Sequence, residues 1–368
     1  MQIHKKNRIF AYNLLSLLQF FHLKKTIQNM KKIKLILLLV VLFTTLSSYA
    51  QKHQLNAYVI GFYNLENLFD TIDDPIKNDA QFLPNGDYAW GTLKYTNKQQ
   101  KMAYAISQMP KNLAILGVSE IENINVLEDL VKQPAIIDRN LKPILIEGPD
   151  RRGVDVGLLY NTKLFTPTNV TSTRITTELE NFFTRDQLCV SGILDGEEIH
   201  IIVLHWPSRS GGEKRSKPRR AEAARTTKHI CDSLFALNPN AKIVVMGDLN
   251  DDPIDPSVTR ELGAKPKIEQ TNPSELFNTT YAFYKQGIGT LAYQDQWNLF
   301  DQIIISHAWL NKDRKTLSYW KTEIFNKDFL KQQEGRYKGY PLRTHASGVW
   351  TNGYSDHFPC LIWVVKYK

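Results

Sequence analysis

Short and almost continuously apolar runs recur along the chain from residue 57 to its end, and they constrain the fold more than any other feature. Runs of this length that are rich in Val and Ile are typical of strands, and strands without polar alternation are covered on both faces. The runs occupy residues 57–65, 113–121, 142–148, 154–161, 187–194, 198–206, 241–249, 300–306 and 359–367. We therefore predict sheets that lie between other layers.

Helical patterns lie between some of these runs, at residues 97–109, 123–133 and 218–237. The last begins at Pro218, a residue favoured in the first turn of a helix. Strands outnumber helices and do not alternate regularly with them. This pattern favours an α/β protein with two packed, mainly antiparallel sheets and helices outside over a parallel doubly wound sheet.

Polar side chains stand at six strand ends. They are Asn64, Glu120, His205, the pair Asp248 and Asn250, Asp301, and the pair Asp356 and His357. Each of them alone has an ordinary role as a turn or cap residue. If two packed sheets bring these ends together, however, the side chains form one acidic pocket that contains two histidines.

This set of side chains indicates a particular chemistry. Its donors are mainly oxygens, and the sequence has no Cys/His spacing of the kind that binds structural zinc. Oxygen donors suit a hard cation such as Mg²⁺, Mn²⁺ or Ca²⁺. A hard cation beside His–carboxylate partners suits phosphodiester hydrolysis, because the metal neutralises charge on the phosphoryl oxygens while a base prepares water for attack.

The ordered set of motifs, from FYNLEN at 62–67 through GDLN at 247–250 to SDHFP at 355–359, resembles the endonuclease/exonuclease/phosphatase superfamily. This superfamily includes deoxyribonuclease I, abasic-site endonucleases, inositol polyphosphate phosphatases and bacterial sphingomyelinases. The resemblance spans nearly all of residues 51–368. It implies a four-layer α/β/β/α sandwich and a metal-dependent phosphodiesterase.

The resemblance also implies a role for each matched residue. The metal ligands would be Asn64, Glu120 and Asp356. His205 would face the phosphate and can serve as an acid, while Asp248 and Asn250 would orient the nucleophile and contact the phosphate. His357 would be the general base, and Asp301 its partner.

Other residues near these motifs leave alternatives open. Glu66 and Glu122 each lie two positions beyond a matched residue, and we expect them to meet solvent or to support the site indirectly. Arg151 and Arg152 either grip a phosphate or form a solvated turn. Asp155 is a candidate to fix the tautomer of His205. Arg209 opens a basic stretch that either contacts a phosphate backbone or is simply solvated.

The first 50 residues read as a leader. They contain eight Lys or Arg and no acidic residue, whereas the remainder has 38 basic and 37 acidic residues, so the overall charge of +9 does not indicate a basic domain. Residues 30–50 have a basic start, a short apolar run and small residues at Ser48 and Ala50, as a secretory signal does. We expect Met30 to be the true start, cleavage after Ala50, an exported protein in the periplasm or outside the cell, and a single catalytic domain at 51–368. An uncleaved N-terminal anchor is the alternative.

Three functions compete. The first is a secreted nuclease of little sequence specificity that acts on nucleic acid, DNA foremost, as a monomer without stable membrane insertion. The second is a lipid or small-molecule phosphoesterase; aromatic residues at 70–94 could favour a membrane, but five Asp residues surround them. The third is a binding module without activity, which the presence of every matched residue argues against. The order of preference is as given, because fold resemblance does not fix function.

Overall fold

The computed structural model describes residues 2–49, 54–177 and 182–368, and the chain divides into two compact units at residues 54 and 55. The first unit contains one helix, α1 (Gln2–Tyr49). None of the helices in the described ranges combines the length and the hydropathy that crossing a membrane requires. The predicted cleavage site, between Ala50 and Gln51, lies outside the described residues.

The second unit contains two six-stranded sheets. The first sheet has the strand order β13-β16-β1-β2-β4-β3. Its strands are β1 (Leu55–Leu68), β2 (Leu113–Ile121), β3 (Leu141–Leu145), β4 (Asp155–Asn161), β13 (Ser318–Ile324) and β16 (Cys360–Tyr367). Only β1 and β2 pair in parallel; the other neighbours in this sheet are antiparallel.

The second sheet has the order β5-β6-β7-β8-β12-β9 and likewise contains one parallel pair, β7 with β8. Its strands are β5 (Phe165–Thr173), β6 (Gln187–Leu194), β7 (Glu197–His205), β8 (Ile243–Asp248), β9 (Leu276–Asn278) and β12 (Asp301–Ser306). Two small hairpins complete the strands: β10 (Leu291–Tyr293) with β11 (Gln296–Asn298), and β14 (His345–Ala346) with β15 (Val349–Trp350).

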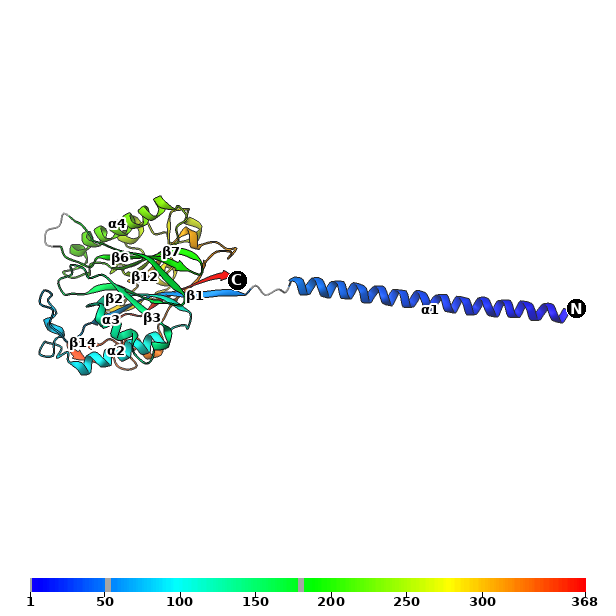
Figure 1. Ribbon diagram of the computed structural model, residues 1–368, viewed down its shortest axis with the longest axis horizontal. Coiled ribbons are helices and arrows are strands. Elements are labelled where there is room, and N and C mark those ends of the chain that lie inside the picture. The colour runs from blue at the N-terminus through cyan, green and yellow to red at the C-terminus, as the bar shows by residue number, and fades with distance from the viewer. Residues whose placement is uncertain (1, 50–53, 178–181) are drawn as a thin grey trace. The chain divides into compact units, whose positions relative to one another are not determined.

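Helices cover the outer faces of both sheets. In Figure 1, α4 (Glu213–Leu237) lies on one side of the stacked sheets, while α2 (Thr92–Ser107) and α3 (Ile124–Val131) lie on the other. Asn123 begins α3 by accepting a hydrogen bond from the Val126 amide at 3.1 Å. A short helix, α5 (Tyr281–Lys285), and single helical turns at Ala80–Phe82, Ile137–Arg139, Ser257–Glu261, Ile268–Gln270, His307–Trp309 and Asp328–Leu330 lie in the connections. The predicted α/β/β/α sandwich is confirmed.

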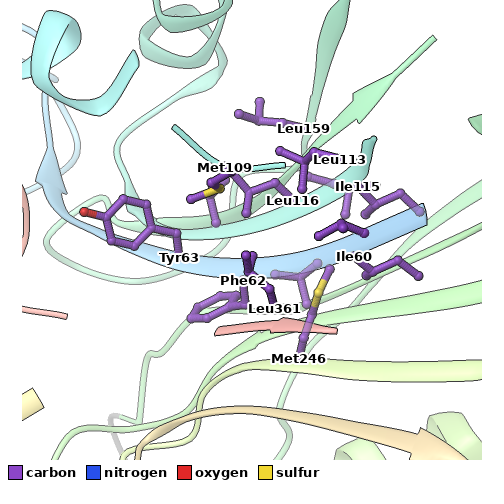
Figure 2. Close-up of a cluster of buried hydrophobic side chains, with 14 of the residues drawn as sticks. Ile60, Phe62, Tyr63, Met109, Leu113, Ile115, Leu116, Leu159, Met246 and Leu361 are labelled. Carbon is purple, nitrogen blue, oxygen red and sulfur yellow. The ribbon is translucent and has the colours of Figure 1, made fainter. Parts of the chain in front are cut away.

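The apolar runs are continuous because both faces of these strands are buried. In β7, Ile201 and Val203 face the first sheet, whereas Ile202 and Leu204 contact α4. Figure 2 shows the core that includes Met246 of β8 together with Ile60 and Phe62 of β1. A Cβ at Gly117 would lie 2.7 Å from Met246 Cε, so this glycine allows the two sheets to approach closely.

Candidate active site

Three polar residues of the second sheet lie side by side where its central strands end. Asp248, the last residue of β8, pairs with His205 at the end of β7 and with Asp301 at the start of β12. This register follows from one parallel and one antiparallel pairing about the same strand. His205 Nε2 lies 3.6 Å from Asp248 Oδ2. All three side chains are buried at the mouth of the sandwich.

The first sheet adds Asn64 and Glu120. Asn64 pairs with Ser119 just before the register of the parallel strands shifts, and Glu120, the next residue of β2, adopts a φ of 60°. Left-handed backbone at a residue other than Gly costs about 1 kcal/mol or more and is concentrated at functional sites. Asn64 Nδ2 donates to Glu120 Oε1 at 3.1 Å and to Asp248 Oδ2 at 3.2 Å. One amide group therefore connects the carboxylates of both sheets.

His357 and Asp301 form a direct pair across the sheets. His357 Nδ1 lies 2.7 Å from Asp301 Oδ2, which leaves Nε2 to face the cluster, 3.8 Å from Asp248 Oδ2 and 3.9 Å from Asp356 Oδ1. Burial lowers the pKa of His357, but the charges of Asp301 and Asp248 outweigh it and leave the pKa well above its usual value. This pair is the one that the motif order predicts.

His205 has the opposite electrostatic environment. Burial, followed by the nearby charges of Arg185 and Arg152, places the pKa of His205 well below its usual value. Its imidazole is therefore neutral at pH 7, which favours donation of a hydrogen bond over donation of a surplus proton. The sequence suggested Asp155 as the partner of His205, but the structure shows otherwise. Asp155 Oδ1 accepts from the Gly148 amide at 2.9 Å, and His205 Nδ1 has no hydrogen-bond partner in the described part of the chain.

Asn250 is held beside this group by the backbone. Its φ is 50°, its amide N–H donates to Asp248 Oδ1 at 2.9 Å, and its Nδ2 donates to the Trp206 carbonyl at 3.0 Å. The GDLN turn thus orients both of its polar side chains, Asp248 and Asn250, at the end of β8.

The tightest group of ligand atoms comprises Glu120, His205 and Asp248, within 4.8 Å of one another. Burial, together with Asp301 and Glu120, outweighs His357 and raises the pKa of Asp248 to about 7. Two carboxylates with one imidazole suit a divalent cation. Of the predicted ligands Asn64, Glu120 and Asp356, only Glu120 belongs to this group. Asn64 presents its NH₂ to the carboxylates, while its Oδ1 accepts from the Glu66 amide at 2.9 Å.

A model of the Endonuclease/Exonuclease/phosphatase family matches residues 59–366. The chain belongs to this family.

Solved structures share the fold of this family member at low identity. They include a humanized Danio rerio TDP2, with 11% identity, a TM-score of 0.52 and coverage of 84% of this chain and 98% of that one. The human nocturnin catalytic domain has 13% identity, a TM-score of 0.51 and coverage of 86% and 97%. A mannosyl-6-phosphatase of Bacteroides thetaiotaomicron has 15% identity, a TM-score of 0.50 and coverage of 83% and 99%. No curated protein sequence matches significantly. Enzymes of the family are typically phosphoesterases that depend on a divalent metal.

Arg343 is a site residue of this family member that the sequence did not reveal. Its guanidinium bridges Asp356 Oδ2, at 2.8 Å, and Glu66 Oε1, at 3.4 Å. Glu66 also accepts from the Thr344 amide at 2.6 Å. Burial and then Asp356 raise the pKa of Glu66 to about 7, against the opposing charges of Lys98 and Arg343. Glu66 therefore supports the site from behind and does not meet solvent; its position two residues after Asn64 was the only signal for it.

Arg185 is a second residue that sequence reasoning missed. It is 5% exposed and donates to the carbonyls of His205, at 3.2 Å, and Trp206, at 2.7 Å, as well as to Asp150 Oδ2 at 3.2 Å. The predicted phosphate ligands lie farther out. Arg151 is exposed and its guanidinium lies 4.6 Å from the Phe183 ring, while Arg152 is exposed and pairs with Asp150 at 3.7 Å. Arg152 is close enough to lower the pKa of His205.

The basic stretch after His205 is neither wholly solvated nor wholly a loop. Helix α4 begins at Glu213, five residues before Pro218. Arg209 donates to the Asn250 carbonyl at 2.9 Å and lies 3.1 Å from Asp255. Arg220 is fully buried, with its Nε 2.7 Å from Asp251 Oδ1. Arg209 and Arg220 therefore hold the turn after GDLN in place, and the exposed basic side chains are those of Lys214, Arg215 and Lys217.

Proposed function

We propose that this protein is a divalent metal-dependent phosphodiesterase that cleaves nucleic acid. The observation that carries the proposal is the contact between His357 and Asp301, with His357 Nε2 directed at the carboxylate cluster. A bound divalent cation would neutralise charge on the phosphoryl oxygens. The two carboxylates of the tightest ligand set, Glu120 and Asp248, would hold it, which leaves the adjacent Nε2 of His205 to the phosphate.

In the proposed reaction, neutral His357 takes a proton from water through Nε2. The water oxygen forms a bond to phosphorus, and the bond from phosphorus to the leaving oxygen breaks. Asp301 fixes the tautomer of His357 and stabilises the imidazolium that forms. Asn64 positions Glu120 and Asp248 by donating to both, and neutral His205 donates a hydrogen bond to the phosphate.

Nucleic acid as the substrate is supported by exposed positive charge on two segments. Arg151 and Arg152 are exposed, with Arg152 close enough to lower the pKa of His205, and Lys214, Arg215 and Lys217 are exposed on the first turns of α4. Side chains of this kind bind a phosphate backbone without reading its sequence. The charge is smaller than the sequence suggested, because Arg209 and Arg220 are taken up by Asp251 and its neighbours.

A small phosphoester is the second candidate substrate. The ion pairs of Arg209 and Arg220 with Asp251 favour it, because they leave less positive charge free for a phosphate backbone. A membrane lipid is less well supported. The aromatic residues of 70–94 pack together, with Phe82 stacked on Phe69 at 4.1 Å and Trp90 fully buried, so they form no exposed aromatic hairpin. A binding module without activity is the third candidate, and the intact His357–Asp301 pair argues against it.

One comparison separates these candidates. The purified protein is incubated with plasmid DNA, single-stranded DNA, RNA, sphingomyelin, bis(p-nitrophenyl) phosphate and p-nitrophenyl phosphate, in Mg²⁺, Mn²⁺ or Ca²⁺, or in EDTA. Metal-dependent cleavage of nucleic acid is expected. Cleavage of the monoester alone would support a phosphatase, and no turnover of any substrate in Mg²⁺, Mn²⁺ or Ca²⁺ would support the binding module.

Export is a separate proposal. The basic start at Met30, the apolar run and the small residues Ser48 and Ala50 support cleavage before Gln51. N-terminal sequencing of protein recovered from outside the cytoplasm should return Gln51. A mature chain that begins upstream of Met30 would contradict both the start and the cleavage site.

A further inference from the structure

A cavity of about 550 Å³ opens beside the catalytic cluster. Its walls come from the turn of the β10–β11 hairpin, from residues 332–343, and from the β14–β15 hairpin with the segment that follows it. A cavity of this size holds a ligand about as large as a single nucleotide, since small-molecule pockets measure roughly 300–1,000 Å³. A duplex does not fit into it.

The cavity and the catalytic cluster share two residues. Asp356 and Arg343 both line the cavity, and Asp356 Oδ1 lies 3.9 Å from His357 Nε2. A phosphate at the cluster therefore has its attached group at the mouth of the cavity. The Arg343 side chain, which lies at this boundary, is about half exposed.

Tyrosine rings dominate the walls. Tyr293 is 66% exposed and Tyr337 is 51% exposed, and both line the cavity. Tyr340 lies 5.5 Å from Tyr337, ring to ring. The two walls are held together, since Asp295 in the β10–β11 turn accepts from Tyr340 at 2.8 Å and from Arg336 at 3.2 Å.

We propose that this cavity binds the nucleobase of a nucleotide whose phosphate lies at the catalytic cluster. The inference rests on the proposed function and deepens it. A base has two flat π faces that stack on tyrosine, and its polar edge suits the amide groups of Gln294 and Gln332, which also line the cavity. Because the cavity takes one nucleotide, the substrate is a single-stranded or terminal nucleotide, and an intact duplex is a poor one.

Calorimetry tests the cavity directly. The full-length protein is titrated in EDTA, where neither ligand is turned over, with AMP and with ribose 5-phosphate. AMP should bind at least about 10-fold more tightly, since stacking of one base on one aromatic ring corresponds to about 5- to 150-fold in affinity. Tyr337→Ala should remove most of this difference, and Tyr337→Phe, which retains the ring face, should keep it. Trp320→Ala is the matched control, since Trp320 is 52% exposed but meets Trp363 of β16 edge to face, outside the cavity.

A second ligand shows whether the bound base belongs to a nucleic acid strand or to a free nucleotide. If a single-stranded oligoadenylate shows the same dependence on Tyr337 as AMP, the cavity holds a nucleotide of a strand; if only AMP does, it holds a free nucleotide. Equal binding of AMP and ribose 5-phosphate, or full AMP affinity in folded Tyr337→Ala, would overturn the inference.

The failures of the two proposals are distinguishable. Hydrolysis of bis(p-nitrophenyl) phosphate in Mg²⁺ without base-dependent binding overturns the cavity assignment and leaves the phosphodiesterase in place. Base-dependent binding without turnover of any phosphoester overturns the phosphodiesterase alone.

Discussion

His357 Nδ1 lies 2.7 Å from Asp301 Oδ2, although Asp301 begins a strand of the second sheet and His357 precedes a strand of the first. Asp301 is fully buried, and its other oxygen has no hydrogen-bond partner among the described residues. The carboxylate therefore acts mainly on one imidazole. The pair forms only when the two sheets are packed, so catalysis and the sandwich interface depend on each other.

Activity should fall as the pH decreases through the pKa of His357. A base must be neutral, and Asp301 and Asp248 favour the protonated form and hold this pKa well above its usual value. Asp301→Asn removes the carboxylate that raises the pKa of His357 more than Asp248 does. The acidic limb of kcat/KM against pH should therefore move to lower pH in this variant, with a lower plateau. An unchanged limb would show that another group limits the rate in acid.

Glu120→Gln should weaken metal binding by about 100-fold or more and reduce turnover with it, because the substitution keeps the shape and removes a negative charge from the ligand set. Isothermal titration with Mn²⁺ measures the affinity. Glu122→Gln is the matched control, since Glu122 lies two residues farther along the same segment but accepts from the Asp70 amide at 2.6 Å, away from the cluster. Equal losses in both variants, or full activity in EDTA, would remove Glu120 from the metal site.

Arg220→Met should destabilise the fold by about 3–5 kcal/mol, because it leaves the buried Asp251 carboxylate without its closest cation. Lys217→Met, on the exposed face of the same helix, should change stability by no more than about 0.5 kcal/mol. Urea denaturation followed by circular dichroism measures both. Similar stabilities of the two variants would show that the Arg220–Asp251 pair contributes little.

Neutralising Lys214, Arg215 and Lys217 together should raise KM for long nucleic acid and flatten its dependence on salt, because fewer counterions are released on binding. Hydrolysis of bis(p-nitrophenyl) phosphate should hardly change, since these side chains lie on the exposed face of α4 and outside the cluster. A parallel loss for both substrates would instead place the stretch in the catalytic machinery or in the fold.

The polar residues at the strand ends were predictable, because an Asp or His at the end of an otherwise apolar run stands out in the sequence. The apolar runs predicted both sheets, and the residues that end them, Asp248 and His205 among them, predicted which side chains meet. The direction of each side chain was not predictable. Asn64 was expected to offer its oxygen to a metal; its NH₂ donates to Glu120 and Asp248, and its Oδ1 accepts from the Glu66 amide.

The surroundings of the site were largely invisible in the sequence. Arg343 and Arg185 belong to no motif, and they reach the site only through long-range contacts with Asp356 and with the His205 carbonyl. The basic stretch was misread for the same reason. Its exposure was inferred from composition, whereas Arg220 is fully buried against Asp251, a residue of the turn after β8.

The central claim is that His357 and Asp301 act as one unit, and a double-mutant cycle in kcat tests it most directly. Asp301→Asn and His357→Ala should each reduce kcat by about 10³- to 10⁴-fold, and the double variant should lose little more, because residues that act together are not additive. Thermal melts confirm that each variant is folded. Losses that multiply in the double variant, or a His357→Ala enzyme that keeps most of its kcat, would contradict the mechanism.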